Sequence, residues 1–418
     1  MKLPSPHLES RTVPDSTPDP SEVPGGTPEL SVVMPCLDEA ETLGGCIEKV
    51  QNVFRDHRID GEIIVADNGS TDGSSAIARR MGARLISIKE KGYGNALRHG
   101  IELSRGRYVI TGDADASHDL SQIPLFLAKL REGYDLVIGN RFKGTIQAGA
   151  MPPLHRYLGT PVLTQLGKLL FRSPCGDQQC GFRGFSRAAF SRMNLRSTGM
   201  EFASEVVMKA SCLRLRITEV PTTQFPAGRR RPPHLRTWRD GWRHLRLMLL
   251  HSPRWLFFYP GALLVLAGVV IGAWLLPGPQ TIQGITFDIH TLLYAATAVA
   301  LGFQSVTFAV FTKVYTIREG LLPEDPRIQR LLGAVSLELG LIAGAALVVF
   351  GFGASLYAVA SYGAHHFGNL DPVKTMRLII PATLSLTLGG EIMLSSLFLS
   401  VLLLGRRAES AGRDPAAG

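Results

Sequence analysis

Short apolar runs alternate with amphipathic stretches in the first half of the chain. Four runs rich in β-branched residues are too short for helices and predict buried strands: residues 30–35, 62–66, 84–88 and 108–111. The stretches between them have helical periodicity, and in residues 38–54 Asp38 is the candidate N-cap. Strands that alternate with helices in this way predict a parallel α/β sheet.

From about residue 255 the apolar segments are much longer. A helix needs about 20 apolar residues to cross a bilayer. Four segments reach that length: residues 255–276, 291–312, 331–360 and 378–404. Gly261 and Gly268 in the first segment recur as Gly344 and Gly351 in the third, which indicates two duplicated helical hairpins. The sequence therefore predicts an all-α membrane domain of four transmembrane helices.

The charges between the apolar segments indicate the orientation of the chain. Residues 277–290 contain no Lys or Arg, whereas residues 313–330 contain four, and Arg406 and Arg407 follow the last segment. Positively charged loops stay on the cytoplasmic side of a membrane. We therefore expect an integral multi-pass protein of the plasma or inner membrane, with its N-terminal domain and both termini in the cytoplasm.

Arginines cluster immediately before the first long apolar segment of this chain, whose net charge is +9. Residues 229–246 interleave arginines with Trp238 and Trp242, a pattern typical of an amphipathic helix at a bilayer surface. Basic and aromatic residues also bind single-stranded nucleic acid. The direct continuation into membrane sequence argues against that partner, so we expect a bilayer and no nucleic acid.

These patterns divide the chain of 418 residues into five parts. The first residues are rich in Pro, Ser, Thr, Asp and Glu, a composition typical of disorder. The expected parts are a disordered tail at 1–29, an α/β domain at 30–228, a basic interfacial segment at 229–254, a transmembrane domain of two hairpins at 255–404 and a cytoplasmic tail at 405–418.

Two carboxylates, Asp113 and Asp115, directly follow the predicted strand at 108–111. Carboxylates this close repel each other unless a cation lies between them or one is protonated. Mg²⁺ or Mn²⁺ takes such oxygen ligands together with substrate phosphates. A polar loop that caps the next helix is the alternative. Polar residues also follow the strands at 30–35 and 62–66, and ligands of parallel sheets bind at that edge, which favours a metal and diphosphate site.

Several sequence blocks resemble family-2 glycosyltransferases with the GT-A fold: VMPCLDEAETL, EIIVADNGSTDGS, KGYGNALRHGI and GDADASHD. Three later blocks resemble the dolichyl- and polyprenyl-phosphate hexose synthases of that family: DLVIGNRF, DQQCGFRGFSRAAF and GMEFASEVVMKA. The resemblance implies that residues 30–228 form a GT-A catalytic domain, with a mostly parallel nucleotide-binding sheet and flanking helices. Asp38, Asn68, Ser117 and Asp119 depart from the residues usual in the family, which leaves the third metal ligand open.

The resemblance also implies a reaction. A hexose would pass from a nucleotide sugar, of the GDP-mannose or UDP-glucose type, to a polyprenyl or dolichyl phosphate. Inversion at the anomeric carbon and a Mg²⁺ or Mn²⁺ cofactor are implied as well. The implied ligands of the nucleotide sugar are Pro35, Asp38, Glu39, Asp67, Lys91 and Asp113. The implied metal ligands are Asp113 and Asp115, and Asp115 also counts as catalytic.

Further residues are candidates for the two phosphates. Arg141 and Arg183 can donate charge-assisted hydrogen bonds to phosphate oxygens, with a plain surface charge as the alternative. An acceptor phosphate is already anionic and needs no strong base, but Asp177 is the candidate if a base is used. For Glu205, acceptor binding and a solvated helix face are both open. At the membrane surface, the lipid phosphate would meet Arg229, Arg230 and Arg231.

Two other functions stay open. His251-Ser-Pro-Arg-Trp255 resembles the Gln-x-x-Arg-Trp signature of processive polysaccharide synthases, although the Gln is absent. A processive or other lipid glycosyltransferase is therefore one alternative. The other is a catalytically inactive membrane protein that binds or translocates lipid. An oligomer is compatible with all three functions.

Overall fold

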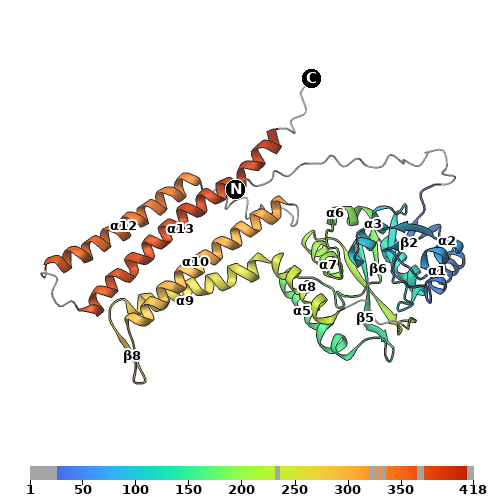
Figure 1. Ribbon diagram of the computed structural model, residues 1–418, viewed down its shortest axis with the longest axis horizontal. Helices are drawn as coiled ribbons and strands as arrows, with labels where there is room; N and C mark the ends of the chain where they lie inside the picture. Colours follow the sequence, from blue (N-terminus) through green and yellow to red (C-terminus); the bar gives the residue numbers. More distant parts are fainter. Residues whose placement is uncertain are drawn as a thin grey trace.

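The computed structural model describes residues 26–230, 236–319, 325–326, 330, 336–364 and 371–411. A seven-stranded sheet with flanking helices occupies the first part of the chain, and long helices extend away from it in the second part (Figure 1). The predicted fold class, a mostly parallel α/β domain followed by an all-α membrane domain, is confirmed.

The sheet has the strand order β3-β2-β1-β4-β6-β5-β7. Its strands are β1 (Leu30–Cys36), β2 (Gly61–Asp67), β3 (Arg84–Ser87), β4 (Tyr108–Thr111), β5 (Leu136–Ile146), β6 (Arg183–Ser186) and β7 (Ile217–Gln224). The first four strands in the chain pair in parallel, as the sequence pattern predicts. β6 runs antiparallel to β4 and β5, whereas β5 and β7 are parallel.

Helices connect the strands and pack their apolar residues onto the sheet. They are α1 (Leu43–Asp56), α2 (Ser74–Arg80), α3 (Tyr93–Glu102), α4 (Ile123–Arg131), α5 (Thr160–Phe171), α6 (Arg187–Met193) and α7 (Phe202–Cys212). The predicted N-cap at Asp38 is wrong, because α1 begins only at Leu43. Asp38 lies in the preceding loop with a φ of 56°, a conformation that Asp tolerates better than most residues. Its carboxylate instead accepts the N–H of Thr71 at 2.7 Å.

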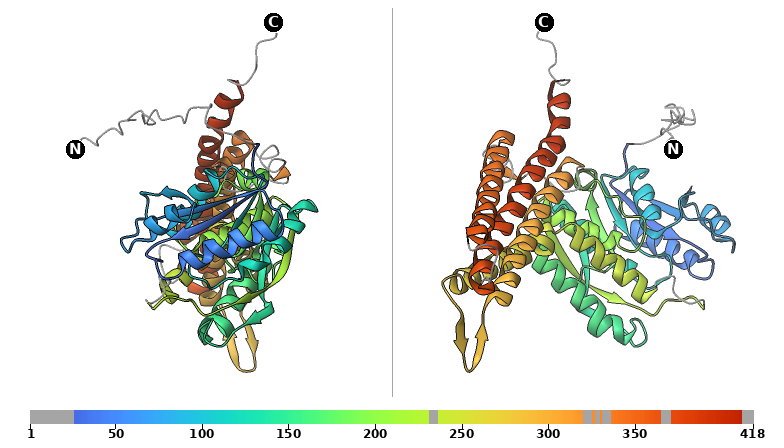
Figure 2. Two further views of the ribbon diagram at one scale, coloured as in Figure 1. Left: turned by 90° about the vertical axis from the view of Figure 1, so that its right-hand side faces the viewer. Right: turned by 60° about the vertical axis from the view of Figure 1, so that its left-hand side comes forward.

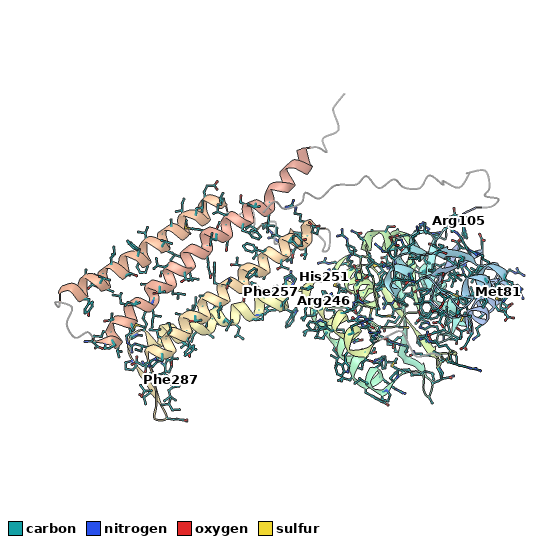
Figure 3. The ribbon with its side chains drawn as sticks, in the orientation of Figure 1. Met81, Arg105, Arg246, His251, Phe257 and Phe287 are labelled. Atoms are coloured by element: carbon teal, nitrogen blue, oxygen red, sulfur yellow. The ribbon has the colours of Figure 1, made fainter. Side chains whose placement is uncertain are left out.

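Helix α8 (Thr237–Leu250) joins the two parts of the molecule. Asp240, His244 and Met248 repeat at one-turn spacing and are buried. Trp238 and Trp242 are 80% and 57% exposed. One face of this helix thus packs inside the protein, and the two tryptophans lie on an exposed face. In Figure 3, Arg246 and His251 mark the junction between the α/β domain and the long helices. Met81 lies on the opposite side of the α/β domain.

Four helices in the described part of the chain are long and apolar enough to cross a membrane: Arg254–Leu275, Ile289–Arg318, Leu337–Gly363 and Pro372–Leu403. They correspond to the four predicted segments and contain η4 (Arg254–Phe258), α9 (Tyr259–Leu275), α10 (Ile289–Arg318), α12 (Leu337–Ala364) and α13 (Pro372–Ala411). In space α9 packs on α10, α10 on α13, and α13 on α12 (Figure 2). The two-stranded hairpin of β8 (Gln280–Ile282) and β9 (Ile285–Phe287) connects α9 to α10 at the end far from the sheet (Figure 1).

The two membrane hairpins, α9–α10 and α12–α13, close on small residues in the same way. A Cβ on Gly261 would lie 2.7 Å from the carbonyl oxygen of Gly302, and a Cβ on Gly344 would lie 2.7 Å from that of Gly389. A second contact of this kind joins Gly268 to Ala295 and Gly351 to Ala382. The repeated glycines of the sequence therefore mark equivalent packing positions in two similar hairpins.

An arginine closes each end of the seam between the hairpins. At the far end, Arg377 of α13 forms an ion pair with Asp288 and donates to the carbonyl of Leu275. At the near end, Arg318 of α10 donates to the carbonyl of Leu402 at 3.0 Å. These contacts fix α10 and α13 side by side.

Candidate active site

The carboxyl ends of β1 and β2 bring predicted nucleotide-sugar residues together. Pro35 in β1 pairs with Ala66 in β2, next to Asp67 at the end of that strand. Asp67 is buried and accepts the N–H of Ser70 at 3.1 Å. The Lys91 ammonium approaches the same turn and donates to the carbonyl of Asn68 at 2.6 Å. Because β2 and β1 are parallel neighbours, these residues share one edge of the sheet.

The loop after β1 is fixed against the loops after β2 and β4. The N–H of Asp38 donates to the hydroxyl of Ser70, and the N–H of Glu39 donates to the hydroxyl of Ser74, both at 2.9 Å. The hydroxyl of Thr42 donates to the carbonyl of Ala114, between the two aspartates, at 2.7 Å. Three chain segments that are distant in sequence thus form one polar surface.

Asp113 directly precedes Ala114 in the loop after β4. Its Oδ1 accepts the hydroxyl of Tyr93 at 3.0 Å, and its Oδ2 lies 3.7 Å from Nδ1 of His118. Burial and the nearby negative charge of Asp115 raise the pKa of Asp113, while His118 acts in the opposite direction. A cation bound here would relieve the unfavourable charge, which is the arrangement that the two aspartates predict.

Asp115 is held differently. Its Oδ1 accepts the N–H of Ser117 at 3.0 Å, and its Oδ2 lies 3.3 Å from Nη2 of Arg229. The described residues contain no group of three or more His, Cys, Asp or Glu side chains arranged to hold a metal. Two carboxylates alone fit a hard divalent ion whose other positions are filled by diphosphate oxygens and water. The residues present are therefore compatible with Mg²⁺ or Mn²⁺ that arrives with its nucleotide.

Arg229 bridges the carboxylates of Glu39 and Asp115 through its two terminal nitrogens. The chain after β7 is aligned for this contact by its backbone: the N–H of Gly228 donates to the carbonyl of Asp115 and the N–H of Phe225 to that of Ser117, both at 2.9 Å. Arg230, the next residue, has an exposed side chain, and Arg231 lies outside the described residues.

Arg141 and Asp177 form a buried bidentate ion pair. Nε of Arg141 donates to Oδ2 of Asp177 at 2.6 Å and Nη2 donates to Oδ1 at 2.9 Å. Burial alone would lower the pKa of Arg141, but the Asp177 carboxylate raises it above its ordinary value. Both oxygens of Asp177 are thus occupied by the guanidinium, which Asp177 orients. The remaining nitrogen, Nη1, donates to Oε1 of Gln224 at 3.4 Å, its one hydrogen-bond partner within the described part of the chain.

Arg183 and Glu205 are both engaged inside the protein. The guanidinium of Arg183 in β6 is buried and donates to three backbone carbonyls, those of Cys180, Ala203 and Gln178, at 2.7, 2.8 and 2.7 Å. The carboxylate of Glu205 accepts the N–H groups of residues 196 and 197 and pairs with Lys209 at 2.9 Å. Burial raises the pKa of Glu205, but Lys209 and these hydrogen bonds hold it below its ordinary value. Both side chains hold neighbouring loops in place.

Sequence reasoning did not single out Tyr93 or Glu219. Tyr93 lies in the KGYGN block and reaches Asp113 from the start of α3. Glu219 in β7 accepts hydrogen bonds from the backbone of the loop that carries Asp177. The sequence around Glu219 is typical of an ordinary strand. Gly176, which contacts Glu219 in space, is the one sequence signal that could have indicated a close approach of the loop to β7.

Two family models match the chain. Residues 31–193 match the model of glycosyl transferase family 2, and residues 310–403 match the C-terminal transmembrane region of glycosyltransferase family 2. A low-salt glycan biosynthesis hexosyltransferase of Haloferax volcanii is 36% identical over 363 residues, which cover 84% of this chain and 86% of that protein. The dolichyl-phosphate hexose transferase of the same organism is 29% identical over 194 residues, which cover 46% of this chain and 81% of that protein.

Among solved structures, the chain is similar to glucosyl-3-phosphoglycerate synthase from Mycobacterium tuberculosis in complex with Mn²⁺, UDP and glucosyl-3-phosphoglycerate. The TM-score is 0.42 and the identity 22%, over 54% of this chain and 80% of that one. A likeness this distant does not bear on the chemistry of the site.

Proposed function

This chain belongs to glycosyltransferase family 2, and on that premise we propose that it moves one hexose from a nucleotide sugar to a polyprenyl or dolichyl phosphate held in the membrane. The donor would be of the GDP-mannose or UDP-glucose type. One observation carries the proposal. The carboxylates of Asp113 and Asp115 and the oriented guanidinium of Arg141 lie in one domain, on a chain that continues into four helices of membrane-spanning length.

The proposed reaction breaks the bond between the anomeric carbon and the diphosphate, and a phosphate oxygen of the lipid attacks that carbon from the opposite face. A bound Mg²⁺ or Mn²⁺, held by Asp113 and Asp115, would offset the charge that develops on the leaving diphosphate. Arg141, oriented by Asp177, provides a fixed positive charge for a phosphate. Because the attacking oxygen is already anionic, the reaction needs no free base, in agreement with the engagement of Asp177.

The loops at the sheet edge bind and orient the donor in this proposal. Asp38, Glu39 and Asp67 face the nucleoside, and Lys91 adds a positive charge at the same turn. The lipid would arrive from the bilayer beside α8, with the domain and both termini in the cytoplasm. Arg230 is the described arginine whose exposed side chain suits the lipid phosphate.

Product formation tests the proposal. The purified protein in detergent or nanodiscs is incubated with a panel of UDP- and GDP-hexoses and a polyprenyl phosphate, and glycolipid is measured. Asp113→Asn and Asp115→Asn should each lower kcat by about 10²–10³-fold, since removal of one transition-state stabiliser has that effect. Asp119→Asn is the matched control, because among the described residues this carboxylate of the same loop accepts hydrogen bonds from Ser121 alone.

Chelation adds an independent arm. EDTA should abolish transfer, and Mn²⁺ or Mg²⁺ should restore it. Full activity in chelator would remove the metal from the proposal. Absence of product with every donor and lipid, from a protein that still binds polyprenyl phosphate, would favour the catalytically inactive lipid-binding alternative.

A further inference from the structure

We infer that Glu219 is a positioning residue that fixes the ion pair of Arg141 and Asp177 in the orientation needed for phosphate. The inference deepens the proposed function and rests on it in one respect, the role of Arg141. Glu219 lies in β7, outside every motif that marks the site, and its side chain is only 9% exposed.

Glu219 accepts four hydrogen bonds from two separate segments. Its Oε1 accepts the N–H of Gly176 at 2.5 Å and the N–H of Asp177 at 3.2 Å. Its Oε2 accepts the side-chain amide of Asn140 and the ammonium of Lys143, both at 2.9 Å. One carboxylate thus joins the loop of Asp177 to the strand β5 that carries Arg141.

The two segments that Glu219 joins are the ones that must be aligned for the ion pair. Asn140 immediately precedes Arg141, and the β5–β7 pairing changes register between Asn140 and Thr145, so the ladder does not fix this part of β5. On the other side, Glu219 holds the backbone of Asp177 while the carboxylate of Asp177 holds Arg141. Glu219 therefore replaces the missing strand pairing at the point where the guanidinium projects.

The loop that carries Asp177 packs closely against the side chains of Asn140 and Glu219, and a glycine stands at the contact. A Cβ on Gly176 would lie 2.7 Å from Nδ2 of Asn140 and 3.4 Å from Oε2 of Glu219. A side chain at this position would displace the amide of Asn140, which donates to the Glu219 carboxylate. Glycine at 176 therefore leaves room for the hydrogen bond between Asn140 and Glu219.

The negative charge of Glu219 is essential to this arrangement. Burial raises the pKa of Glu219, but the hydrogen bonds from Lys143 and Asn140 hold it below its ordinary value. An ionised carboxylate accepts all four hydrogen bonds, whereas a glutamine would turn an NH₂ donor toward other donors. The side chain of Lys143 is 62% exposed, so water screens its ion pair with Glu219 in part.

The first test is kinetic and uses the full-length protein. Glu219→Gln should lower kcat about 10- to 100-fold, the usual loss when a supporting residue of a site is removed, with the donor KM nearly unchanged. In an Arg141→Lys background the same change should add little, because both variants lose the same oriented guanidinium. The matched control is Glu62→Gln. Glu62 also accepts hydrogen bonds from a backbone N–H and a hydroxyl, at the opposite, amino end of β2, so its loss should leave kcat unchanged.

The second test needs no substrate. Phenylglyoxal modifies accessible guanidinium groups, and peptide mass spectrometry measures the rate at each arginine. Arg141 should be protected in the wild type and react at least about fivefold faster in Glu219→Gln, as expected when a buried ion pair loses its support. Arg183, whose three guanidinium nitrogens each donate to a carbonyl, should stay protected in both proteins and report that the domain is folded.

If Glu219→Gln does not fold, Asn140→Ala removes one of the four hydrogen bonds and should expose Arg141 in the same way. A folded Glu219→Gln protein in which Arg141 stays protected, or in which the loss of kcat is fully additive with Arg141→Lys, overturns the inference. A wild type that transfers no hexose would overturn the proposed function instead, and the labelling of Arg141 would still decide the role of Glu219.

Discussion

Arg229 places a cation among the carboxylates that a metal would use, and we expect the two to compete. Its guanidinium pairs with Glu39 and lies 3.3 Å from Oδ2 of Asp115. A divalent ion that takes Asp115 as a ligand must displace Nη2 of this arginine. Arg229→Ala should therefore tighten the binding of Mn²⁺ in the absence of nucleotide, the opposite of the usual effect of losing a residue in a site.

The magnitude follows from the contact that is lost. The contact with Asp115 is an ion pair, and two unit charges about 4 Å apart attract each other by about 1 kcal/mol in water and about 4 kcal/mol near a protein surface. The side chain of Arg229 is 14% exposed, so water screens this contact only in part. A divalent ion that no longer has to break the contact should bind roughly 10- to 100-fold more tightly, since about 1.4 kcal/mol corresponds to a factor of ten.

Electron paramagnetic resonance of free Mn²⁺ measures this dissociation constant directly. Arg230→Ala is the matched control: it removes the same charge one residue away, from an exposed side chain, and should change the affinity little. Arg229→Lys should lie between wild type and alanine, because an ammonium cannot bridge two carboxylates as a guanidinium does. Unchanged or weaker Mn²⁺ binding by Arg229→Ala would show that the arginine does not compete for the site.

Two further predictions concern stability. His244 of α8 is buried against Ser204 of α7, and burial lowers its pKa to about 4. The unfolded chain binds the proton near the ordinary value of 6.5, so the free energy of unfolding should fall by about 3 kcal/mol as the pH drops from 6.5 to 4. Thermal melts across that range should show this loss in the wild type and a flatter profile in His244→Gln, and equal slopes in the two would contradict it. In the second membrane hairpin, Gly351→Val should destabilise the protein by about 1–3 kcal/mol through overpacking, whereas Gly353→Val, which meets no atom within 4 Å, should be tolerated. Equal yield and melting temperature of these two variants would refute the packing.

The edge of the sheet where the site lies could be predicted from sequence because it depends on strand order alone. In a parallel sheet every strand ends at the same side, so residues that follow β1, β2 and β4 must meet there. Asp67 and Asp113 are found where that rule places them. The pairing of the membrane helices was also predictable, because regularly spaced glycines lie on one face of a helix and allow a second helix to pack closely against that face.

The partners of the arginines could not be predicted in the same way. Arg229 belongs to a basic run whose composition indicates lipid phosphate, yet it pairs with Glu39, 190 residues earlier. Arg183 is a candidate phosphate ligand in sequence, but its three guanidinium nitrogens donate to carbonyls that only the folded chain brings together. Such contacts depend on how β7 and β6 join the sheet, and no local pattern encodes that.

Each membrane hairpin can form before the next one is synthesised. The contact of Gly261 with Gly302 closes α9 on α10 without any atom from α12 or α13. The second hairpin is attached to the first by Arg377, near the start of α13, and by the contact of Arg318 with Leu402, near its end, so both contacts require that α13 has been synthesised. The membrane domain should therefore insert as two successive pairs of helices, and a gene that ended after α10 would still encode an anchored enzyme to which duplication could add the second pair.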